Sequence, residues 1–343
     1  MVKVGMIGTG FIGGVHYSAY CKTQGAKVVA ICDLDKGKVE NLIKGKASGG
    51  NISVESANPL SFDPGEIKIY TDIGKILKDP DVEMVDICLP TYMHKDAVIK
   101  VVKTGKHVLC EKPMSLNLKE ADEMIKVTKK EKVKFMIAHV IRFWPEYVVL
   151  KEIIQKKSLG KLLYASFMRH SATPVWTWNN WILDTKKSLS AAVDLHIHDT
   201  DYILYICGMP KKVMSLGATK VTKGIDQIMT EYIYGNGAKL YAEGGWAFPP
   251  NYPFRMAFWS MFEKGAVEYN SMNVPLTVYE NGKDPVQPKL PEGDGYLREI
   301  QYFLKCVEEN KYPSIVTPED ARDALAIALC ELKSVETGNP VVI

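Results

Sequence analysis

The chain has 343 residues, more than a single hydrophobic core usually serves, so two domains are expected. A hydrophobic fraction of 46%, a charged fraction of 24% and a formal net charge of +3 are ordinary for a globular enzyme, and no Lys/Arg run is long enough for a nucleic-acid footprint. Seven scattered cysteines without a C-x-x-C pair argue against a disulfide framework or zinc site and favour a reducing, cytoplasmic location. Neither a signal peptide nor a membrane span is expected.

The first part of the chain alternates short β-rich runs with helical patterns, which predicts an α/β domain with a doubly wound parallel sheet. This NAD-binding Rossmann domain is expected at residues 1–122, with its last elements reaching to about 145 as an alternative. The Gly/Ser/Asn/Pro-rich segment Lys44–Gly65 interrupts the pattern as a long loop, either functional or merely tolerated. The predicted strands are Val2–Ile7, Lys27–Asp33, Ile67–Tyr70, Val82–Leu89, His107–Cys110 and Phe135–His139, and the predicted helices are Phe11–Gln24, Thr71–Lys78, His94–Thr104 and Leu118–Lys130.

From about Lys161 the strands follow one another without intervening helices, which predicts a large, mostly antiparallel sheet in an α+β domain at residues 123–343. Tyr234–Gly237 is a hairpin signal. One helix, Ala192–Cys207, is expected before most of the strands. Two helices close the chain. As an alternative to a place in the second domain, the last of these helices packs back on the first domain. The strands are Lys161–His170, Lys211–Val221, Asp226–Tyr234, Ala238–Trp246, Arg255–Glu263, Ala266–Tyr269 and Leu276–Glu280, and the closing helices are Tyr296–Glu309 and Pro318–Gly338, with Thr317 as a cap.

A glycine turn follows the first predicted strand and opens the first helix. Gly8, Gly10 and Gly13 have the spacing G-x-G-x-x-G. The first glycine permits the tight turn, the second lets a pyrophosphate approach the backbone, and the third lets the helix pack on the strand. The backbone N–H groups that start the helix, at Phe11 and Ile12, are suited to bind phosphate.

Asp33 ends the second strand, 20 residues after Gly13. A carboxylate there can accept hydrogen bonds from the hydroxyls of the adenosine ribose. It would also repel the 2′-phosphate of NADP, no arginine follows it closely, and Asp35 adds a second acid that Lys36 only partly offsets. The sequence therefore predicts a dinucleotide site that favours NAD over NADP.

Four segments resemble those of the glucose–fructose oxidoreductase/inositol dehydrogenase (Gfo/Idh/MocA) family, and together they span essentially the whole chain. They are Gly8–His16, Gly105–Pro113, Asp194–Asp201 and Thr317–Arg322. The resemblance implies a two-domain oxidoreductase that transfers a hydride between NAD and a secondary alcohol of a sugar, cyclitol or related polyol. It also implies a homo-oligomer, a dimer or tetramer, formed through the open face of the second domain's sheet.

Lys112 follows a predicted strand at its carboxyl end, where open α/β sheets bind ligands. By the resemblance, Lys112 polarises the reacting oxygen, Glu111 organises the lysine and cofactor, and the Lys112–Pro113 bond tends to be cis. Asp194 and His198 are four residues apart, so they would share one helix face, with His198 taking the hydroxyl proton and Asp194 orienting the sugar or the imidazole. A solvated lysine, a helix cap and a core histidine are the alternatives.

Five further residues are secondary candidates. Pro90, Thr91 and His94 resemble the family's proline-containing loop along the cofactor, with helix capping as the alternative. Arg142 is a candidate to bind a substrate oxygen or to pair with an acid. Trp176 and neighbouring aromatic residues are candidates to stack on a sugar face or to pack in a core or subunit contact.

The residue between the catalytic candidates is often small in the family, and here it is His196. It is a candidate to contact substrate, to be structural, or to join a metal site with His198, Asp199 and Asp201; no metal is expected. Ser188–Ala192 replaces the family's usual glycine-rich lead-in, which leaves the local geometry open. Two other functions remain open on this scaffold: a glycosidase that uses bound NAD for transient oxidation, and a non-catalytic dinucleotide or sugar sensor.

Overall fold

The computed structural model describes residues 1–45, 63–235 and 237–343, so most of the Lys44–Gly65 loop and Asn236 of the glycine hairpin lie outside it. The chain forms two compact units. Unit 1 comprises Met1–Val140, Trp176–Trp181 and Asp294–Arg322, and unit 2 comprises Ile141–Val175, Ile182–Gly293 and Asp323–Ile343. The boundary expected from the sequence was residue 122, or as late as about 145; the structure divides the chain first at Val140 and gives unit 1 two later segments.

Unit 1 contains a six-stranded parallel sheet with the order β3-β2-β1-β4-β5-β6. The central strands are buried along nearly their whole length, as expected for a sheet covered on both faces. This is the doubly wound Rossmann arrangement that the alternation of strands and helices predicts. The strands are β1 (Val2–Ile7), β2 (Ala26–Cys32), β3 (Lys68–Tyr70), β4 (Met84–Ile87), β5 (His107–Glu111) and β6 (Phe135–Ala138).

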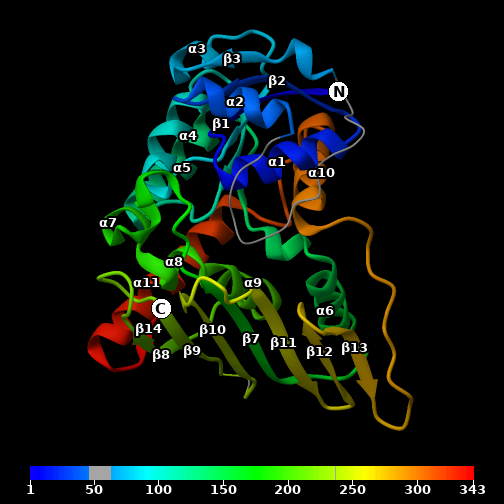
Figure 1. The fold of residues 1–343 in the computed structure, drawn as a ribbon. Helices are drawn as coiled ribbons and strands as arrows, with labels where there is room; N and C mark the ends of the chain where they lie inside the picture. Colours follow the sequence, from blue (N-terminus) through cyan, green and yellow to red (C-terminus); the bar gives the residue numbers. More distant parts are fainter. Residues whose placement is uncertain (46–62, 236) are drawn as a thin grey trace. The chain divides into compact units, whose positions relative to one another are not determined.

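Six α-helices belong wholly to unit 1 within the described residues (Figure 1). Four of them begin at an Asp or Asn whose side chain accepts a hydrogen bond from the first turn, whereas α1 begins at Gly10 without a side-chain cap. The late helix α10 packs against α1. The helices are α1 (Phe11–Lys22), α2 (Lys36–Ile43), α3 (Ile73–Leu77), α4 (His94–Val102), α5 (Leu118–Lys130) and α10 (Gly295–Glu308), with 3₁₀ turns η1 (Pro64–Glu66) and η2 (Thr91–Met93).

Unit 2 contains an eight-stranded sheet with the order β13-β12-β11-β7-β10-β9-β8-β14. All neighbours are antiparallel except β7 and β10, so the mostly antiparallel prediction is confirmed. β9 and β10 pair as the glycine signal at Tyr234–Gly237 predicts. The strands are β7 (Leu162–Ala172), β8 (Lys212–Ala218), β9 (Gln227–Ile233), β10 (Lys239–Phe248), β11 (Arg255–Phe262), β12 (Gly265–Asn270), β13 (Val274–Glu280) and β14 (Val341–Val342).

Aromatic side chains form the core of unit 2 on one face of this sheet. Tyr147 of α6 lies edge-on to Tyr202 of α9 and Phe258 of β11, with ring centroids 4.9 and 5.0 Å apart, and Phe167 of β7 lies 5.5 Å from Tyr202. Each ring is almost fully buried. The other helices are α6 (Pro145–Lys156), α7 (Thr185–Ser188), α8 (Ser190–Asp194), α9 (Ile197–Cys207) and α11 (Pro318–Thr337), with 3₁₀ turns η3 (Val140–Phe143) and η4 (Trp178–Leu183).

The start and end of α11 match the sequence signals. The Thr317 hydroxyl accepts a hydrogen bond from the N–H of Asp320 at 3.0 Å, and the Asp320 carboxylate accepts one from the N–H of Thr317, which is a reciprocal capping box. Gly338 follows the helix with φ +67°, a left-handed conformation that glycine adopts without strain. In the described part of the chain, no helix combines the length and the apolar character needed to cross a bilayer.

Candidate functional site

The glycine turn connects β1 to α1 at the carboxyl edge of the parallel sheet. Gly8 has φ +95°, and a Cβ there would lie 2.5 Å from the carbonyl oxygen of Cys88. A Cβ on Gly13 would overlap the carbonyl oxygen of Gly8, whereas one on Gly10 would meet nothing within 4 Å. Gly8 and Gly13 are therefore required by the fold itself, while Gly10 keeps a stretch of backbone open to a ligand.

Asp33 lies beside this turn. Its Oδ2 accepts hydrogen bonds from the N–H and hydroxyl of Thr9, at 2.8 and 2.7 Å, and its Oδ1 accepts one from the N–H of Asp35. The carboxylate is half-buried just beyond the carboxyl end of β2. It is thus held in a fixed position next to the uncapped start of α1, whose Phe11 and Ile12 supply the first helical N–H groups.

The connection after β4 supplies the next predicted residues. Thr91, which follows Pro90, is buried, and its hydroxyl oxygen has no hydrogen-bond partner among the described residues. His94 is also buried, with its ring nitrogens 2.8 Å from the carbonyl oxygens of Leu89 and Pro113. Its ring ties the β4 connection to the segment after β5, and burial lowers its pKa; a contact of His94 with the cofactor stays a prediction.

Glu111 and Lys112 lie at the carboxyl end of β5, followed by a cis Lys112–Pro113 bond as the resemblance implied. Lys112 is half-buried, and its backbone N–H donates to Oε2 of Glu111 at 3.0 Å. The other carboxylate oxygen of Glu111 lies 3.1 Å from Nε2 of His16, a residue of α1. Burial alone would raise the pKa of Glu111, but the hydrogen bond and charge of His16, with the charge of Lys112, lower it.

Trp176–Trp181 belongs to unit 1 although the sequence places it between strands of unit 2. The ring of Trp181 lies 6.4 Å from that of Tyr92, the residue after Thr91, in a tilted arrangement. Trp176 is half-buried, and Trp178 keeps 47% of its surface exposed. The aromatic segment thus reaches the η2 turn that follows β4.

Asp194 and His198 belong to unit 2 and do not share one regular helix, which corrects the prediction of a continuous Ala192–Cys207 helix. Asp194 is the last residue of α8, and His198 lies in the first turn of α9. Between them the N–H of His196 donates to the carbonyl of Ala191, five residues back, so the regular i→i−4 pattern is interrupted. Asp194 is buried and His198 half-buried.

The lead-in to this segment adopts a conformation that glycine would favour. Leu189 and Ser190 have φ +60° and +61°, in the left-handed region. Ser190 is held there because its N–H donates to the Ser188 hydroxyl and its own hydroxyl donates to the carbonyl of Ile225. The chain therefore keeps a glycine-like backbone without glycine, at a cost of about 1–2 kcal/mol per residue.

Two buried arginine–carboxylate pairs fix helix α9. Arg142 donates through Nε and a terminal nitrogen to Asp201, at 2.9 and 2.7 Å, and Arg169 pairs in the same bidentate way with Asp199 at 2.9 and 3.0 Å. All four residues are almost fully buried. Arg142 thus forms the ion pair that was one of its two alternatives, and both aspartates are engaged by arginine.

His196 is fully buried, which supports the structural alternative among the three expected for it. Its Nε2 lies 3.3 Å from the Tyr232 hydroxyl and 3.5 Å from Glu331, and Thr200 donates to the other oxygen of Glu331 at 3.0 Å. Burial and the charge of Arg169 lower the pKa of His196 to about 3, and burial raises that of Glu331 to about 7. The neutral imidazole is therefore part of a buried polar network between α9, β9 and α11.

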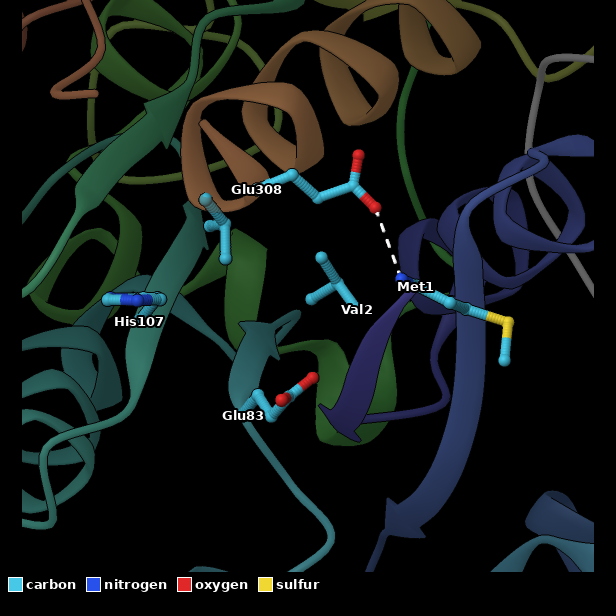
Figure 2. Close-up of a pocket in the computed structure, with 6 residues that line it drawn as sticks. Met1, Val2, Glu83, His107 and Glu308 are labelled. Carbon is cyan, nitrogen blue, oxygen red and sulfur yellow. Dashed lines mark ion pairs between the residues drawn. The ribbon is translucent and has the colours of Figure 1, made fainter. Parts of the chain in front are cut away.

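A pocket of about 500 Å³ lies at the opposite edge of the unit 1 sheet, where the strands begin. Figure 2 shows Val2 at the start of β1, Glu83 just before β4 and His107 at the start of β5, with Glu308 of α10 paired to the N-terminus. These are the amino ends of the parallel strands, whereas ligands of such sheets bind at the carboxyl ends. This pocket is therefore separate from the glycine turn and Lys112.

Two family models match the chain. The model described as "Oxidoreductase family, NAD-binding Rossmann fold" matches residues 2–139, and the one described as "GFO/IDH/MocA C-terminal domain" matches residues 147–268. The chain belongs to the GFO/IDH/MocA oxidoreductase family. This membership confirms the resemblance carried by Gly8–His16 and Gly105–Pro113, and with it an NAD-binding oxidoreductase on a Rossmann fold.

Relatives with assigned activities resemble the chain over nearly its full length. Scyllo-inositol 2-dehydrogenase (NAD(+)) of Bacillus subtilis is 26% identical, covering 99% of this chain and 96% of its own. Myo-inositol 2-dehydrogenase of Thermotoga maritima is 27% identical, covering 98% and 96%. 2,7-Anhydro-N-acetylneuraminate hydratase of Mediterraneibacter gnavus is 26% identical, covering 82% of this chain and 71% of its own. Levoglucosan dehydrogenase in complex with NADH and levoglucosan shares the fold, with a TM-score of 0.84, 20% identity and coverage of 100% and 99%.

The residues of unit 1 fit an NAD molecule. Gly10 leaves open backbone beside an uncapped helix start, the type of site that binds phosphate groups. The Asp33 carboxylate stands next to it at the end of β2, where the ribose of such a cofactor is recognised. The buried hydroxyl of Thr91, unpaired among the described side chains, is a further polar atom at this edge of the sheet.

His16 is the functional candidate that sequence reasoning missed. A signal existed: it is a histidine among mostly apolar residues of the first helix, and Asp86 is a lone acid in the apolar strand β4. Two buried polar groups in apolar elements need each other as partners.

Proposed function

We propose that this oxidoreductase is an NAD-dependent dehydrogenase that acts on a secondary alcohol of a sugar, cyclitol or related polyol. The observation that carries the proposal is the lysine directly after β5, at the carboxyl edge of the sheet that also bears the glycine turn and Asp33. The two inositol dehydrogenases that align with almost the whole chain support the substrate class.

Each proposed role follows from the chemistry of the side chain. NAD, when bound, accepts the hydride from the alcohol carbon. Lys112 donates a hydrogen bond to the reacting oxygen and stabilises negative charge there. His198 takes the hydroxyl proton, since an imidazole titrates near neutral pH, and Asp194 orients the substrate or that ring. Trp176 offers an apolar face to the sugar ring.

The test is a panel of inositols, hexoses and amino sugars, monitored by NADH absorbance. On the best substrate, Lys112→Met should lower kcat by about 10²- to 10⁴-fold, while the exposed Lys119→Met on α5 should leave it unchanged. Full turnover by Lys112→Met would refute the assigned role. His198→Gln should remove a limb of the pH–rate profile.

Cofactor choice is tested on the same substrate. NAD should be preferred over NADP because Asp33 would repel a 2′-phosphate. Asp33→Ala should weaken NAD binding and reduce the preference for NAD over NADP, as measured by the Kd of each cofactor. A preference of the natural chain for NADP would overturn the argument from Asp33.

A second candidate function is a reaction with transient oxidation and no net release of NADH. The similarity to the 2,7-anhydro-N-acetylneuraminate hydratase of Mediterraneibacter gnavus supports this second candidate. Stoichiometric NADH formation on a polyol would exclude it. Consumption of an anhydro sugar or glycoside without NADH release would replace the dehydrogenase proposal.

We also propose a homo-oligomer, formed through the open face of the unit 2 sheet. Trp259 and Met261 of β11 project from this face with 41% and 50% exposure. On the same face, beyond β7 and β10, Met229 of β9 and Leu216 of β8 are 46% and 64% exposed. Such an apolar face is typical of a subunit interface. Trp259→Glu with Met261→Glu should convert a dimer or tetramer to smaller species in light scattering, whereas the exposed Val286→Glu should not. An unchanged mass would refute this interface.

The expected location remains the cytoplasm. All seven cysteines are free thiols, and burial raises the pKa of several of them, such as Cys21 and Cys88. Thiols of this kind persist in a reducing compartment. Fractionation of cells that produce the protein would test the location.

A further inference from the structure

His16 lies between two buried carboxylates of unit 1. Its Nδ1 is 2.8 Å from Oδ2 of Asp86 on β4, and its Nε2 is 3.1 Å from Oε1 of Glu111 on β5. His16 and Asp86 are completely buried and Glu111 nearly so. One side chain of the helix that follows the glycine turn therefore joins two neighbouring strands.

The two flanking carboxylates favour a charged imidazole with a proton on both ring nitrogens. A neutral imidazole carries a lone pair on one nitrogen, and in this site that lone pair would face a carboxylate oxygen. Burial alone would lower the pKa of His16, but the charge of Asp86 and its hydrogen bond raise it well above the ordinary value. The other titratable groups around the ring are Cys88 just after β4, Tyr20 on α1, and Tyr296 of α10 at 6.1 Å.

Glu111 connects this histidine to Lys112. Oε1 faces His16, while Oε2 accepts the backbone N–H of Lys112 at 3.0 Å. A carboxylate can serve both donors because it has two acceptor oxygens, whereas the amide of glutamine has only one. The orientation of Glu111 therefore depends on His16 on one side and sets the backbone of Lys112 on the other.

We propose that His16 is a positioning residue that holds Glu111, and through it Lys112, in the arrangement needed for hydride transfer. The proposal rests on the proposed role of Lys112. It assigns His16 no contact with substrate or cofactor. The set His16, Asp86 and Cys88 also has ligand atoms within 4.8 Å of one another, but the direct His16–Asp86 contact uses the nitrogen and oxygen that a metal would need.

The first test is the protonation state of His16 in the natural chain without added cofactor. Nitrogen NMR of labelled histidine, assigned with His16→Gln, should show both ring nitrogens protonated at about pH 8, where an ordinary histidine is neutral. Asp86→Asn should lower that pKa. A neutral His16, or zinc bound at one ion per chain by elemental analysis, would overturn the proposal.

The second test uses turnover of the best polyol by His16→Gln, Glu111→Gln and the double variant. Each single change should lower kcat by about 10- to 100-fold with KM for the polyol changed much less, because a displaced catalytic group costs rate. The double variant should match Glu111→Gln within about threefold, because both changes break the same connection. Fully additive losses would refute the connection.

The control is His107→Gln, which changes the first residue of β5, the strand that ends at Glu111. The half-buried His107 ring accepts a hydrogen bond from the N–H of Lys134, so its loss should lower Tm but leave kcat unchanged. If His16→Gln also lowers only Tm, its role is structural and the proposal fails. Activity retained by Lys112→Met would instead refute the proposed function, while the NMR result would still decide the state of His16.

Discussion

The most quantitative prediction concerns Glu331 on α11, whose carboxyl is completely buried in unit 2. Burial raises its pKa from 4.5 to about 7, although hydrogen bonds from Tyr232 and Thr200 act in the opposite direction. His196, 3.5 Å away, does not compensate the charge because its own pKa is lowered to about 3. Above neutral pH the folded unit therefore contains a buried, uncompensated carboxylate.

The sign and size of the effect follow from linkage. Between about pH 4.5 and 7 the folded state holds a proton that the unfolded state has released, so stability falls as pH rises through this window and then levels off. A change in pKa from 4.5 to about 7 corresponds to about 3 kcal/mol. Glu331→Gln removes the ionisation, while its amide oxygen can still accept from Thr200 and its NH₂ can donate to His196.

The assay is thermal unfolding of the natural chain and Glu331→Gln at pH 5 and pH 8. The two should differ little at pH 5, and at pH 8 the variant should be more stable by up to about 3 kcal/mol, or about 6–12 °C in Tm. Glu336→Gln, at an exposed position of the same helix, is the control and should show no pH-dependent difference. A stability difference that is constant with pH, or a variant less stable at pH 8, would refute the reasoning.

Two further predictions concern other parts of the fold. Gly13→Ala should lower Tm and the yield of folded protein because its Cβ would overlap backbone atoms. Gly10→Ala should leave Tm unchanged but weaken NAD binding about tenfold or more, as measured by titration. Equal losses of Tm in the two variants would contradict this prediction. Arg142→Met should destabilise unit 2 by about 3–5 kcal/mol in urea unfolding because the buried Asp201 carboxylate loses its bidentate arginine partner, and Arg142→Met with Asp201→Leu should recover much of that loss. A double variant no better than Arg142→Met would contradict the second prediction.

Patterns with a local cause were predicted well. The parallel strands of unit 1 are recognisable because they are continuously apolar and are followed by helices, and α5 has the predicted bounds, Leu118–Lys130, because Asn117 caps it. The capping box at Thr317 and the glycine at position 338 fixed the ends of α11 in the same way. Three helices were missed: α2 and α7, which are short, and α6, which begins at Pro145 after an aromatic residue.

The contacts that were not predicted at the site involve long-range partners that a sequence does not display. Arg142 and Asp201 are 59 residues apart, and nothing local to either indicates a buried bidentate pair. His94 resembles a residue of the family's loop along the cofactor, but its ring nitrogens lie 2.8 Å from the carbonyl oxygens of Pro113 and Leu89. The interruption at His196 arises because its imidazole is buried toward Tyr232 and Glu331, contacts that form only when α9, β9 and α11 pack together.

The division of the chain has a consequence for folding during synthesis. Unit 1 needs residues 294–322, because α10 packs on α1 and presents Tyr296 to His16, and unit 2 needs residues 323–343 for Glu331 and β14. During synthesis, unit 1 therefore cannot be completed before residues 294–322 have left the ribosome, and unit 2 cannot be completed before residues 323–343 have. A nascent chain that ends near Val140 should leave the side of α1 that meets α10 exposed to solvent, which makes it a target for chaperones and proteases rather than a freely folding domain.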